Sequence, residues 1–352
     1  MSDPTPSRDV SFDAFRGVAI LLVVAAHAGV VGWDFRYGDT YHWNFYYSVF
    51  VRQVILCAVP IFLYVSGYWL AGMRVETLSD YLVFLKRRLS RILIPYLIWS
   101  SFFYTVHALR GQPFSASDFL FKLLTGQVEG LYFFLVMLPQ FYLLTPLFVR
   151  LSRARWSIWA VIMVHVLCVG ALYGLRLGYA KDIPFTYIKI PFLSWLSFFY
   201  LGIYFRQWPG TLQHAKAAWL AGTAALFLFL SLVEGGILIH FDYFEFGISD
   251  IKYTTLLYSA AVLVLFATSR QRVRWPRFLT VLGDYSFGIY LIHGFITRVF
   301  HRALMPHAQG LYNVQPLYQA LIVVAVILSC CGIVYVTREV VGKTWASKVL
   351  GF

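Results

Sequence analysis

The chain has 352 residues, of which 60% are hydrophobic and only 13% are charged, and its formal net charge is +13. A soluble domain has about 45–50% apolar and about 25% charged residues, so this composition excludes an ordinary soluble enzyme and indicates a polytopic membrane protein. The basic residues stand in short clusters between apolar runs, which is typical of topology signals, and we therefore expect no nucleic-acid partner.

Ten apolar runs are candidates for membrane-spanning helices, although the sixth and the eighth are short. They cover residues 17–33, 49–73, 89–109, 131–151, 156–175, 190–206, 217–239, 253–268, 279–300 and 317–337. Four of their prolines are expected to kink helices and to leave backbone groups that a neighbour or a cavity must satisfy. These prolines are Pro60, Pro95, Pro139 and Pro146.

We therefore expect an all-α polytopic membrane protein with about ten transmembrane helices around a central cavity. Residues 1–352 are treated as one membrane domain. If the N-terminus is cytoplasmic, 19 of the 29 Lys and Arg residues fall on the cytoplasmic side. This bias predicts that both termini are cytoplasmic, with residues 1–11 and 338–352 as tails.

The first run contains an arginine and a histidine, Arg16 and His27. Eleven residues of α-helix make about three turns and rise about 16 Å, so these two side chains share one face. An ionisable side chain inside a span is costly and normally faces a bundle interior or a wet cavity. His27 is therefore a candidate functional residue, with a histidine that merely hydrogen-bonds to a neighbouring helix as the alternative.

Three further signals follow along the chain, of which Arg88 with Arg91 is the main one. Ser66 is expected at a close helix contact rather than as a nucleophile. Arg88 and Arg91 project from one side of a helix start, where two guanidinium groups could grip phosphates, although a positive-inside stop signal is the alternative. Glu129, before the fourth run, could orient an acceptor hydroxyl or could be a solvated helix end.

The ninth run carries a polar stripe. Ser286, Tyr290 and His293 follow an i, i+4, i+7 pattern and so lie on one helix face, directly after Tyr285. Such a stripe is more often an interhelical hydrogen-bond seam than a row of catalytic groups. Its alignment with the helix of His27 would favour the functional interpretation.

No pattern predicts a metal site or a permanently bound cofactor. The cysteines lie within apolar runs, without the spacing of a disulfide framework or a zinc site, and we expect them to be small packing residues. They are Cys57, Cys168, Cys330 and Cys331. The sequence contains no phosphate-binding loop, dinucleotide fingerprint or serine elbow.

Taken together, several of these short motifs resemble the acyltransferase-3 family of integral membrane acyltransferases. They occur in the order of the family over nearly the whole chain: Phe12-Asp13 with Arg16-Gly17 and His27, the stretch 60–68, Arg88-Leu-Ser-Arg91 with Ile92 and Pro95, the stretch 142–146, and Tyr285-Ser286 through His293. One departure occurs before the fourth run. Where many members have His-Leu-Trp-Phe, this chain has Gly-Leu-Tyr-Phe at residues 130–133.

The resemblance implies an O-acyltransferase that moves an acyl group, usually acetyl, from cytoplasmic acyl-CoA to a hydroxyl of a sugar, a cell-surface glycan or a glycolipid. It implies that His27 is catalytic with Arg16 as its motif partner, and that Arg88 and Arg91 support the CoA end. We add Arg16, Tyr285 and Ser286 as candidate donor-binding residues. The candidate acceptor-binding residues are Ser66, Glu129, Tyr290 and His293.

This chemistry agrees with the residues found independently. Acyl transfer from a thioester to a hydroxyl needs a base near neutral pH, a task for which histidine is suited. We expect His27 to deprotonate the acceptor directly, with a transient acyl-histidine as the less favoured route. Acyl-CoA, the acceptor and the lipid bilayer are the expected partners, and the resemblance implies the bacterial inner membrane as the location.

The main alternative is a proton-coupled transporter or flippase of a small polar or lipid-linked solute, in which His27 and His293 form a proton relay. The absence of visible internal repeats disfavours it mildly. A purely structural membrane subunit is disfavoured because buried polar clusters are costly without a role. The acceptor, succinyl in place of acetyl, the face of the membrane at which transfer ends and the oligomeric state stay open.

Overall fold

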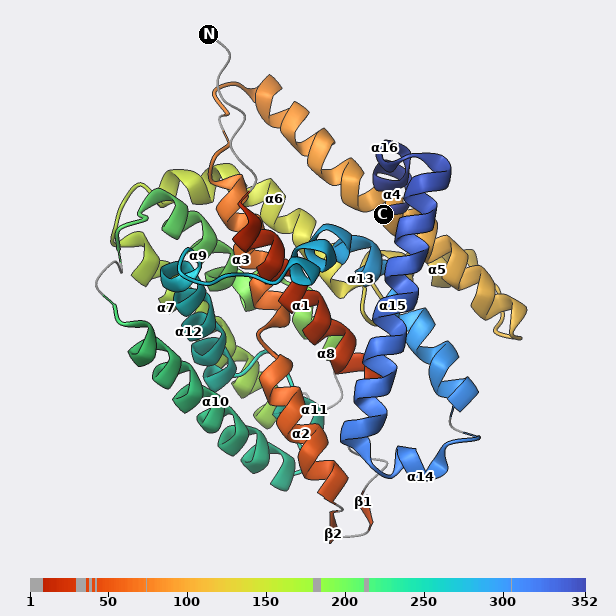
Figure 1. The fold of residues 1–352 in the computed structure, drawn as a ribbon. Helices are drawn as coiled ribbons and strands as arrows, with labels where there is room; N and C mark the ends of the chain where they lie inside the picture. Colours follow the sequence, from red (N-terminus) through yellow and green to blue (C-terminus); the bar gives the residue numbers. More distant parts are fainter. Residues whose placement is uncertain are drawn as a thin grey trace.

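The computed structural model of the chain, drawn in Figure 1, is built almost entirely from helices. It describes residues 9–29, 36–37, 40–41, 43–73, 75–179, 185–211, 215–304 and 306–352. Residues 1–8 of the predicted N-terminal tail and residues 30–33 of the first predicted span lie outside the described residues. In the described part, the only sheet is a two-stranded hairpin of β1 (Arg36–Tyr37) and β2 (Thr40–Tyr41). The prediction of an all-α membrane protein is confirmed.

The main helices correspond in position to the ten predicted runs. They are α1 (Val10–Ala28), α2 (Trp43–Ile55) with α3 (Ala58–Leu70), α4 (Leu78–Leu109), α6 (Phe133–Leu151), α7 (Ser157–Gly174), α9 (Leu196–Gln207), α10 (Ala217–His240), α12 (Tyr253–Ser269), α13 (Arg277–Leu304) and α15 (Gln315–Val341). Among the described residues, eight spans are long and apolar enough to cross a membrane, with α2 and α3 taken as one. The helices α9 and α12 are shorter, as the short sixth and eighth runs predict.

Short elements connect these helices. They are α5 (Ala116–Thr125), a π-turn at Leu175–Tyr179, α8 (Phe185–Lys189), a 3₁₀ turn at Phe192–Trp195, α11 (Phe244–Gly247), α14 (Gln309–Tyr312), α16 (Lys343–Trp345) and a π-turn at Ala346–Leu350. In Figure 1 the beginning of α1 and the C-terminus both lie in the upper half of the view, and the β-hairpin lies at the bottom.

The second predicted span is broken rather than continuous. The helix α2 ends at Ile55 and α3 begins at Ala58. Pro60 supplies the physical reason, because a proline cannot donate to the carbonyl four residues earlier and its ring crowds that carbonyl, which here belongs to Leu56. The broken backbone lies beside a cavity described below, which is where membrane proteins tolerate irregular backbone.

The helix α4 begins eleven residues before the predicted run at residue 89. A capping box explains this start: the Thr77 side chain accepts from the Asp80 backbone N–H, and the Asp80 carboxylate accepts from the Thr77 backbone N–H at 3.0 Å. The added turns contain Asp80 and the basic residues Lys86, Arg87 and Arg88, which interrupt the apolar sequence, so a search for uninterrupted apolar runs does not find them. At the other end of the chain, Leu350 accepts a hydrogen bond from the Trp99 indole at 3.0 Å, and Phe352 is buried.

Two close crossings of helices hold the centre of the bundle. Where α1 meets α13, a Cβ added at Gly17 would lie 2.0 Å from the Leu279 carbonyl oxygen, and one at Gly283 would lie 1.8 Å from that of Asp13. Where α3 meets α9, a Cβ added at Gly67 would likewise clash with the backbone of α9, and one added at Gly202 would clash with the backbone of α3. Small residues let helix backbones approach closely in membranes, so these glycines fix the register of α1 against α13.

Candidate functional site

The first cavity, here called the arginine cavity, has a volume of about 480 Å³. Its polar lining comes from α1, α3, α4, α6 and α13: Arg16, Ser66, Arg88, Arg91, Tyr142, Ser286 and Tyr290. Phe62, Phe134 and Phe287 add aromatic walls. The structure therefore brings together, from five helices, three arginines and Ser66, Ser286 and Tyr290, all of which the sequence predicts as site residues.

Arg16 is tied to α13 rather than left to solvent. Its guanidinium donates to the Ser286 hydroxyl at 2.8 Å and lies 3.8 Å from the Asp13 carboxylate. Ser286 in turn donates to the Gly283 carbonyl at 2.8 Å. The glycine crossing thus brings Arg16 and the first residue of the predicted polar stripe into direct contact.

A wider basic vestibule of about 740 Å³ adjoins the arginine cavity and shares Trp69, Leu70 and Arg88 with it. It adds two arginines that the sequence analysis did not select, Arg206 and Arg270. Both guanidinium groups stack near the Tyr68 ring, 5.1 Å and 5.3 Å from its centroid, and Arg270 forms an ion pair with Asp9. Cationic side chains therefore line both hollows at this end of the bundle.

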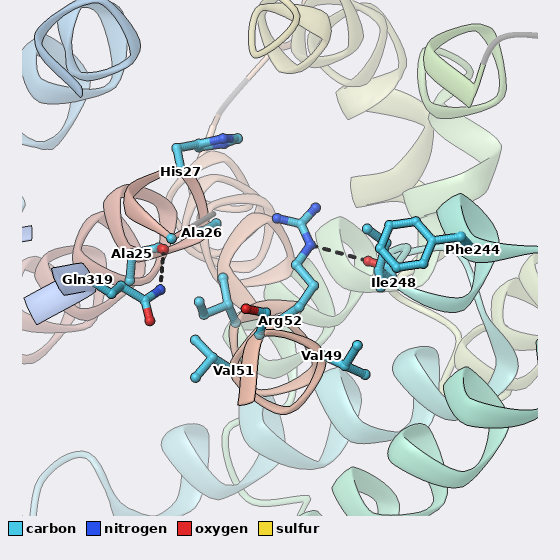
Figure 2. A pocket seen from close by; sticks show the side chains of 12 residues that line it. Ala25, Ala26, His27, Val49, Val51, Arg52, Phe244, Ile248 and Gln319 are labelled. Carbon is cyan, nitrogen blue, oxygen red and sulfur yellow. Dashed lines mark hydrogen bonds between the residues drawn. The ribbon is translucent and has the colours of Figure 1, made fainter. Parts of the chain in front are cut away.

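His27 lines two further hollows of about 240 Å³ each. The histidine cavity is bordered by residues on both sides of the α2–α3 break and by Leu131, Phe133 and Tyr290. The side recess, drawn in Figure 2, lies between α1, α2, α11 and α15. Of the residues that the structure describes, Ala26, His27, Arg52 and Ile55 line both hollows, so the imidazole stands where the two meet.

Tyr290 is the residue shared by the arginine cavity and the histidine cavity. Its hydroxyl donates to the Leu131 carbonyl. Vestibule, arginine cavity, histidine cavity and side recess therefore form a series in which each hollow shares lining residues with the next. Arg16 and His27 face successive members of this series from the same helix.

His293, the last residue of the polar stripe, lies against His27, with ring centroids 5.5 Å apart. Its Nδ1 lies 3.1 Å from the Ile289 carbonyl oxygen and 2.8 Å from that of Tyr290. Carbonyls only accept, so Nδ1 carries the proton and the neutral ring offers a lone pair at Nε2. Within the described residues, this buried Nε2 has no hydrogen-bond partner, which leaves it available to a neighbouring donor such as His27.

Three charged residues that the sequence analysis missed border the histidine cavity: Arg52, Lys189 and Asp250. The Asp250 carboxylate lies 3.2 Å from the Lys189 amine and 3.9 Å from the Arg52 guanidinium. Burial lowers the pKa of Lys189, an effect that Asp250 opposes and Arg52 reinforces. The available signal was Arg52, which is the only charged residue in the apolar run 49–73.

Glu129 and Tyr285 lie outside the hollows described above. Glu129 is buried and accepts two hydrogen bonds of 2.7 Å from the Arg298 guanidinium, while His107 lies 3.7 Å away. The Tyr285 ring is covered by the Arg338 guanidinium, 4.5 Å from its centroid. The structure thus gives Glu129 an ion-pair environment. Ser66, a candidate acceptor-binding residue, lines the arginine cavity rather than the space around His27.

The described residues contain no group of three or more His, Cys, Asp or Glu side chains that could hold a metal ion. All four cysteines are free. At residues 130–133, Gly130, Leu131 and Phe133 line the histidine cavity, and the Tyr132 hydroxyl donates to the Leu291 carbonyl at 2.7 Å. The segment that departs from the family motif therefore lies at the histidine cavity and not at the arginine cavity.

The chain as a whole is similar to known proteins. A family model described as an acyltransferase domain, the acyltransferase-3 model, matches residues 9–336. The chain is 26% identical to a putative membrane-bound acyltransferase, YfiQ of Bacillus subtilis, over 69% of each chain. It is 27% identical to the nodulation protein NolL of Sinorhizobium fredii over 57% of this chain and 50% of that one.

A third similarity is to a probable poly-β-1,6-N-acetyl-D-glucosamine export protein of Staphylococcus aureus, 21% identical over 70% of this chain and 71% of that one. No solved structure matches the chain at a significant level.

Proposed function

The chain belongs to the acyltransferase-3 family and is an integral, multi-pass membrane acyltransferase, and from this premise we propose that it moves an acetyl group from acyl-CoA to a hydroxyl of a sugar, a cell-surface glycan or a glycolipid. The observation that carries the proposal is the series of adjoining hollows that runs from the arginines to His27. A donor with a polyanionic end and a long uncharged arm matches such a series.

In this proposal the arginines bind the donor. Arg16, Arg88 and Arg91 offer guanidinium forks to the phosphates of CoA, which suit such planar donors better than a lysine would. Ser286 supports this end through its hydrogen bond to Arg16. The uncharged arm then carries the thioester past Tyr290 toward His27, about 16 Å along α1 from Arg16.

His27 acts as the general base. Its imidazole accepts the proton of the acceptor hydroxyl while the oxygen attacks the thioester carbonyl carbon. The carbon–sulfur bond then breaks, and the thiolate leaving group takes the proton back from the imidazolium, so that an O-ester and free CoA leave. His293 is a positioning residue here: its Nε2 lone pair favours the His27 tautomer whose basic nitrogen faces the substrate.

The acceptor occupies the histidine cavity and the side recess. Because the donor arginines and His27 are well separated along α1, the acyl group crosses much of the membrane thickness while CoA stays at the cytoplasmic side. Cytoplasmic termini and a bacterial inner-membrane location belong to this proposal. A glycan acceptor is supported by the name of the staphylococcal relative, which refers to a polysaccharide.

The test is transfer of radiolabelled acetyl from acetyl-CoA to glycan extracts by the purified protein in nanodiscs. We expect His27→Ala to lower turnover by about 10²–10⁴-fold, the usual contribution of a general base, while acetyl-CoA binding is retained. His240→Ala is the matched control, because His240 is an exposed histidine at the end of α10. Turnover that is indifferent to His27, or a wild type that does not bind acetyl-CoA, would contradict the proposal and favour a proton-coupled transporter.

A further inference from the structure

The position of Arg52 carries a further inference about the acceptor, and it rests on the proposed function. Arg52 lies on α2, four residues before the break in the span. Its side chain lines both the histidine cavity and the side recess, and His27 is the only other ionisable residue that lines both hollows. The structure therefore places one strong cation directly beside the space in which the acceptor hydroxyl must meet the base.

The guanidinium of Arg52 is held in place but retains donors. Its Nε donates to the Ile248 carbonyl at 3.2 Å, and Figure 2 shows the two terminal nitrogens extending into the space that His27 borders. Among the described residues, the carboxylate nearest to this guanidinium is that of Asp250, 3.9 Å away, which is too long for a hydrogen bond. Its other oxygen lies 3.2 Å from Lys189.

An arginine inside a membrane span is costly unless a partner or a ligand compensates it. Its planar fork matches the two oxygens of a carboxylate or a phosphate better than it matches a neutral hydroxyl. Because Asp250 does not engage the fork by a hydrogen bond, the terminal N–H groups of Arg52 are suited to an anion that arrives with the substrate.

We propose that Arg52 binds an anionic group of the acceptor, so that the preferred acceptor is a sugar bearing a carboxylate or a phosphate rather than a neutral sugar. Lys189, on the wall of the histidine cavity, adds a second cation to this anchor. A sugar held by its acidic group at Arg52 has its ring beside the His27 imidazole. The anchor thus selects the acceptor and also orients its hydroxyl.

The experiment compares three probes: methyl glucoside, methyl glucuronide and methyl glucoside 6-phosphate. Their binding is measured as thermal stabilisation of the full-length protein in nanodiscs without acyl-CoA. We expect both acidic probes, or one of them, to bind about tenfold or more tightly than the neutral one, which is the range of a hydrogen bond to a charged group. The carboxylate and phosphate arms identify which anion is recognised.

Arg52→Gln is expected to abolish this preference, and Arg302→Gln, which removes an exposed arginine from α13, is expected to retain it. Equal binding of all three probes, stabilisation by none of them, or a preference that survives in Arg52→Gln would overturn the inference. So would an Arg52→Gln variant that keeps the preference but transfers acetyl more slowly to every acceptor, because Arg52 would then act on the transition state.

Measuring the binding of the sugar probes in the absence of acyl-CoA tests the anion site at Arg52 separately from the proposed acyltransferase function. A wild type that binds acidic sugars in an Arg52-dependent manner but transfers no acetyl contradicts the proposed function and leaves the anion site standing. A wild type that transfers acetyl through His27 without any preference for acidic acceptors contradicts only the anion site.

Discussion

The two ends of the series of hollows are built differently. The arginine cavity is framed by five of the main helices, and α1 and α13 are locked together there at Gly17 and Gly283. The histidine cavity is framed by a broken span, the short helix α8 and the loop before α12, and its charged residues come from three distant segments. The arginine cavity therefore lies between directly packed helices, whereas the histidine cavity is formed at a helix break, a short helix and a loop.

This difference suggests a division of labour. In the proposed function, one donor can be bound by side chains at fixed helical spacing, whereas specificity for a particular acceptor requires a part of the fold that can vary without disturbing the bundle. Loops and helix breaks tolerate substitution better than the packed helices that they join. The departure at residues 130–133, which lies at the histidine cavity, agrees with this view.

The largest expected effect tests the rigidity of the arginine end. In Gly283→Ala the new Cβ would lie 1.8 Å from the Asp13 carbonyl oxygen, so the backbones of α1 and α13 must separate. In Gly294→Ala, on the same helix but at the histidine end, the nearest atom is a terminal methyl carbon of Leu131, 2.7 Å away, which can rotate aside. We expect Gly283→Ala to destabilise the protein by about 1–3 kcal/mol or more, as overpacking does.

Gly294→Ala is expected to leave the melting temperature nearly unchanged, as is Gly222→Ala, whose Cβ meets no atom within 4 Å. The measurement is thermal unfolding in nanodiscs for all three variants. Equal losses at Gly283 and Gly294 would show that both ends are equally rigid and would remove the structural basis of the comparison.

The next effect separates donor from acceptor. Arg88→Gln removes a guanidinium from both the arginine cavity and the vestibule. We expect KM for acetyl-CoA to rise about tenfold or more, the range of a hydrogen bond to a charged group, with KM for the acceptor unchanged. Lys86→Gln, on the exposed side of the same helix, is the control. A rise in acceptor KM alone would reverse the assignment of the two ends.

A smaller effect concerns Glu129, which we predicted as an acceptor-orienting residue. Glu129 forms a bidentate ion pair with Arg298. We expect Glu129→Gln to lower the free energy of unfolding by only about 1–2 kcal/mol, because Arg298 is half-exposed and solvent screens the pair. Arg298→Gln should cost a similar amount, and the double variant should cost less than the sum. If acceptor KM rises in Glu129→Gln while stability holds, the acceptor role is supported instead.

The central helices could be predicted from the sequence because their signals are periodic. The 3.6-residue period placed Ser286, Tyr290 and His293 on one face of a helix, and the structure brings the first to Arg16 and the last to His27. Apolar runs located the helices well. They could not show where α2 ends, because hydropathy is continuous across Leu56, and only Pro60 marked the break.

The charged lining of the histidine cavity could not be predicted in the same way. Arg52, Lys189 and Asp250 are separated by 137 and 61 residues in the sequence, and no local period links them. Their meeting depends on how α2, α8 and the loop before α12 pack, which is a tertiary property. A lone arginine in an apolar run was the single sequence signal, and a buried charge of that kind indicates function but not its partners.

The smallest expected effect comes from a buried cation next to α2. Lys252 is fully buried and donates to the Gln53 side chain at 2.8 Å and to the Ser231 carbonyl at 3.2 Å. Burial lowers the pKa of Lys252 from 10.5 to about 8, against the opposing influence of Glu234 and Asp250. The folded state therefore releases this proton at a lower pH than the unfolded state does.

Between about pH 8 and pH 10.5 the unfolded chain binds more protons at Lys252 than the folded chain, so stability should rise with pH across this window. Below pH 8 both states hold the proton, and the cost of burying the charge is constant. Lys252→Met removes the titration but fills a similar volume, and Gln53 keeps its 2.7 Å hydrogen bond from Ser231. We expect the melting temperature of the wild type to rise relative to that of Lys252→Met as the pH increases from 7.5 to 9.5. Parallel curves would mean that solvent reaches Lys252 and that its surroundings beside α2 are wetter than their packing indicates.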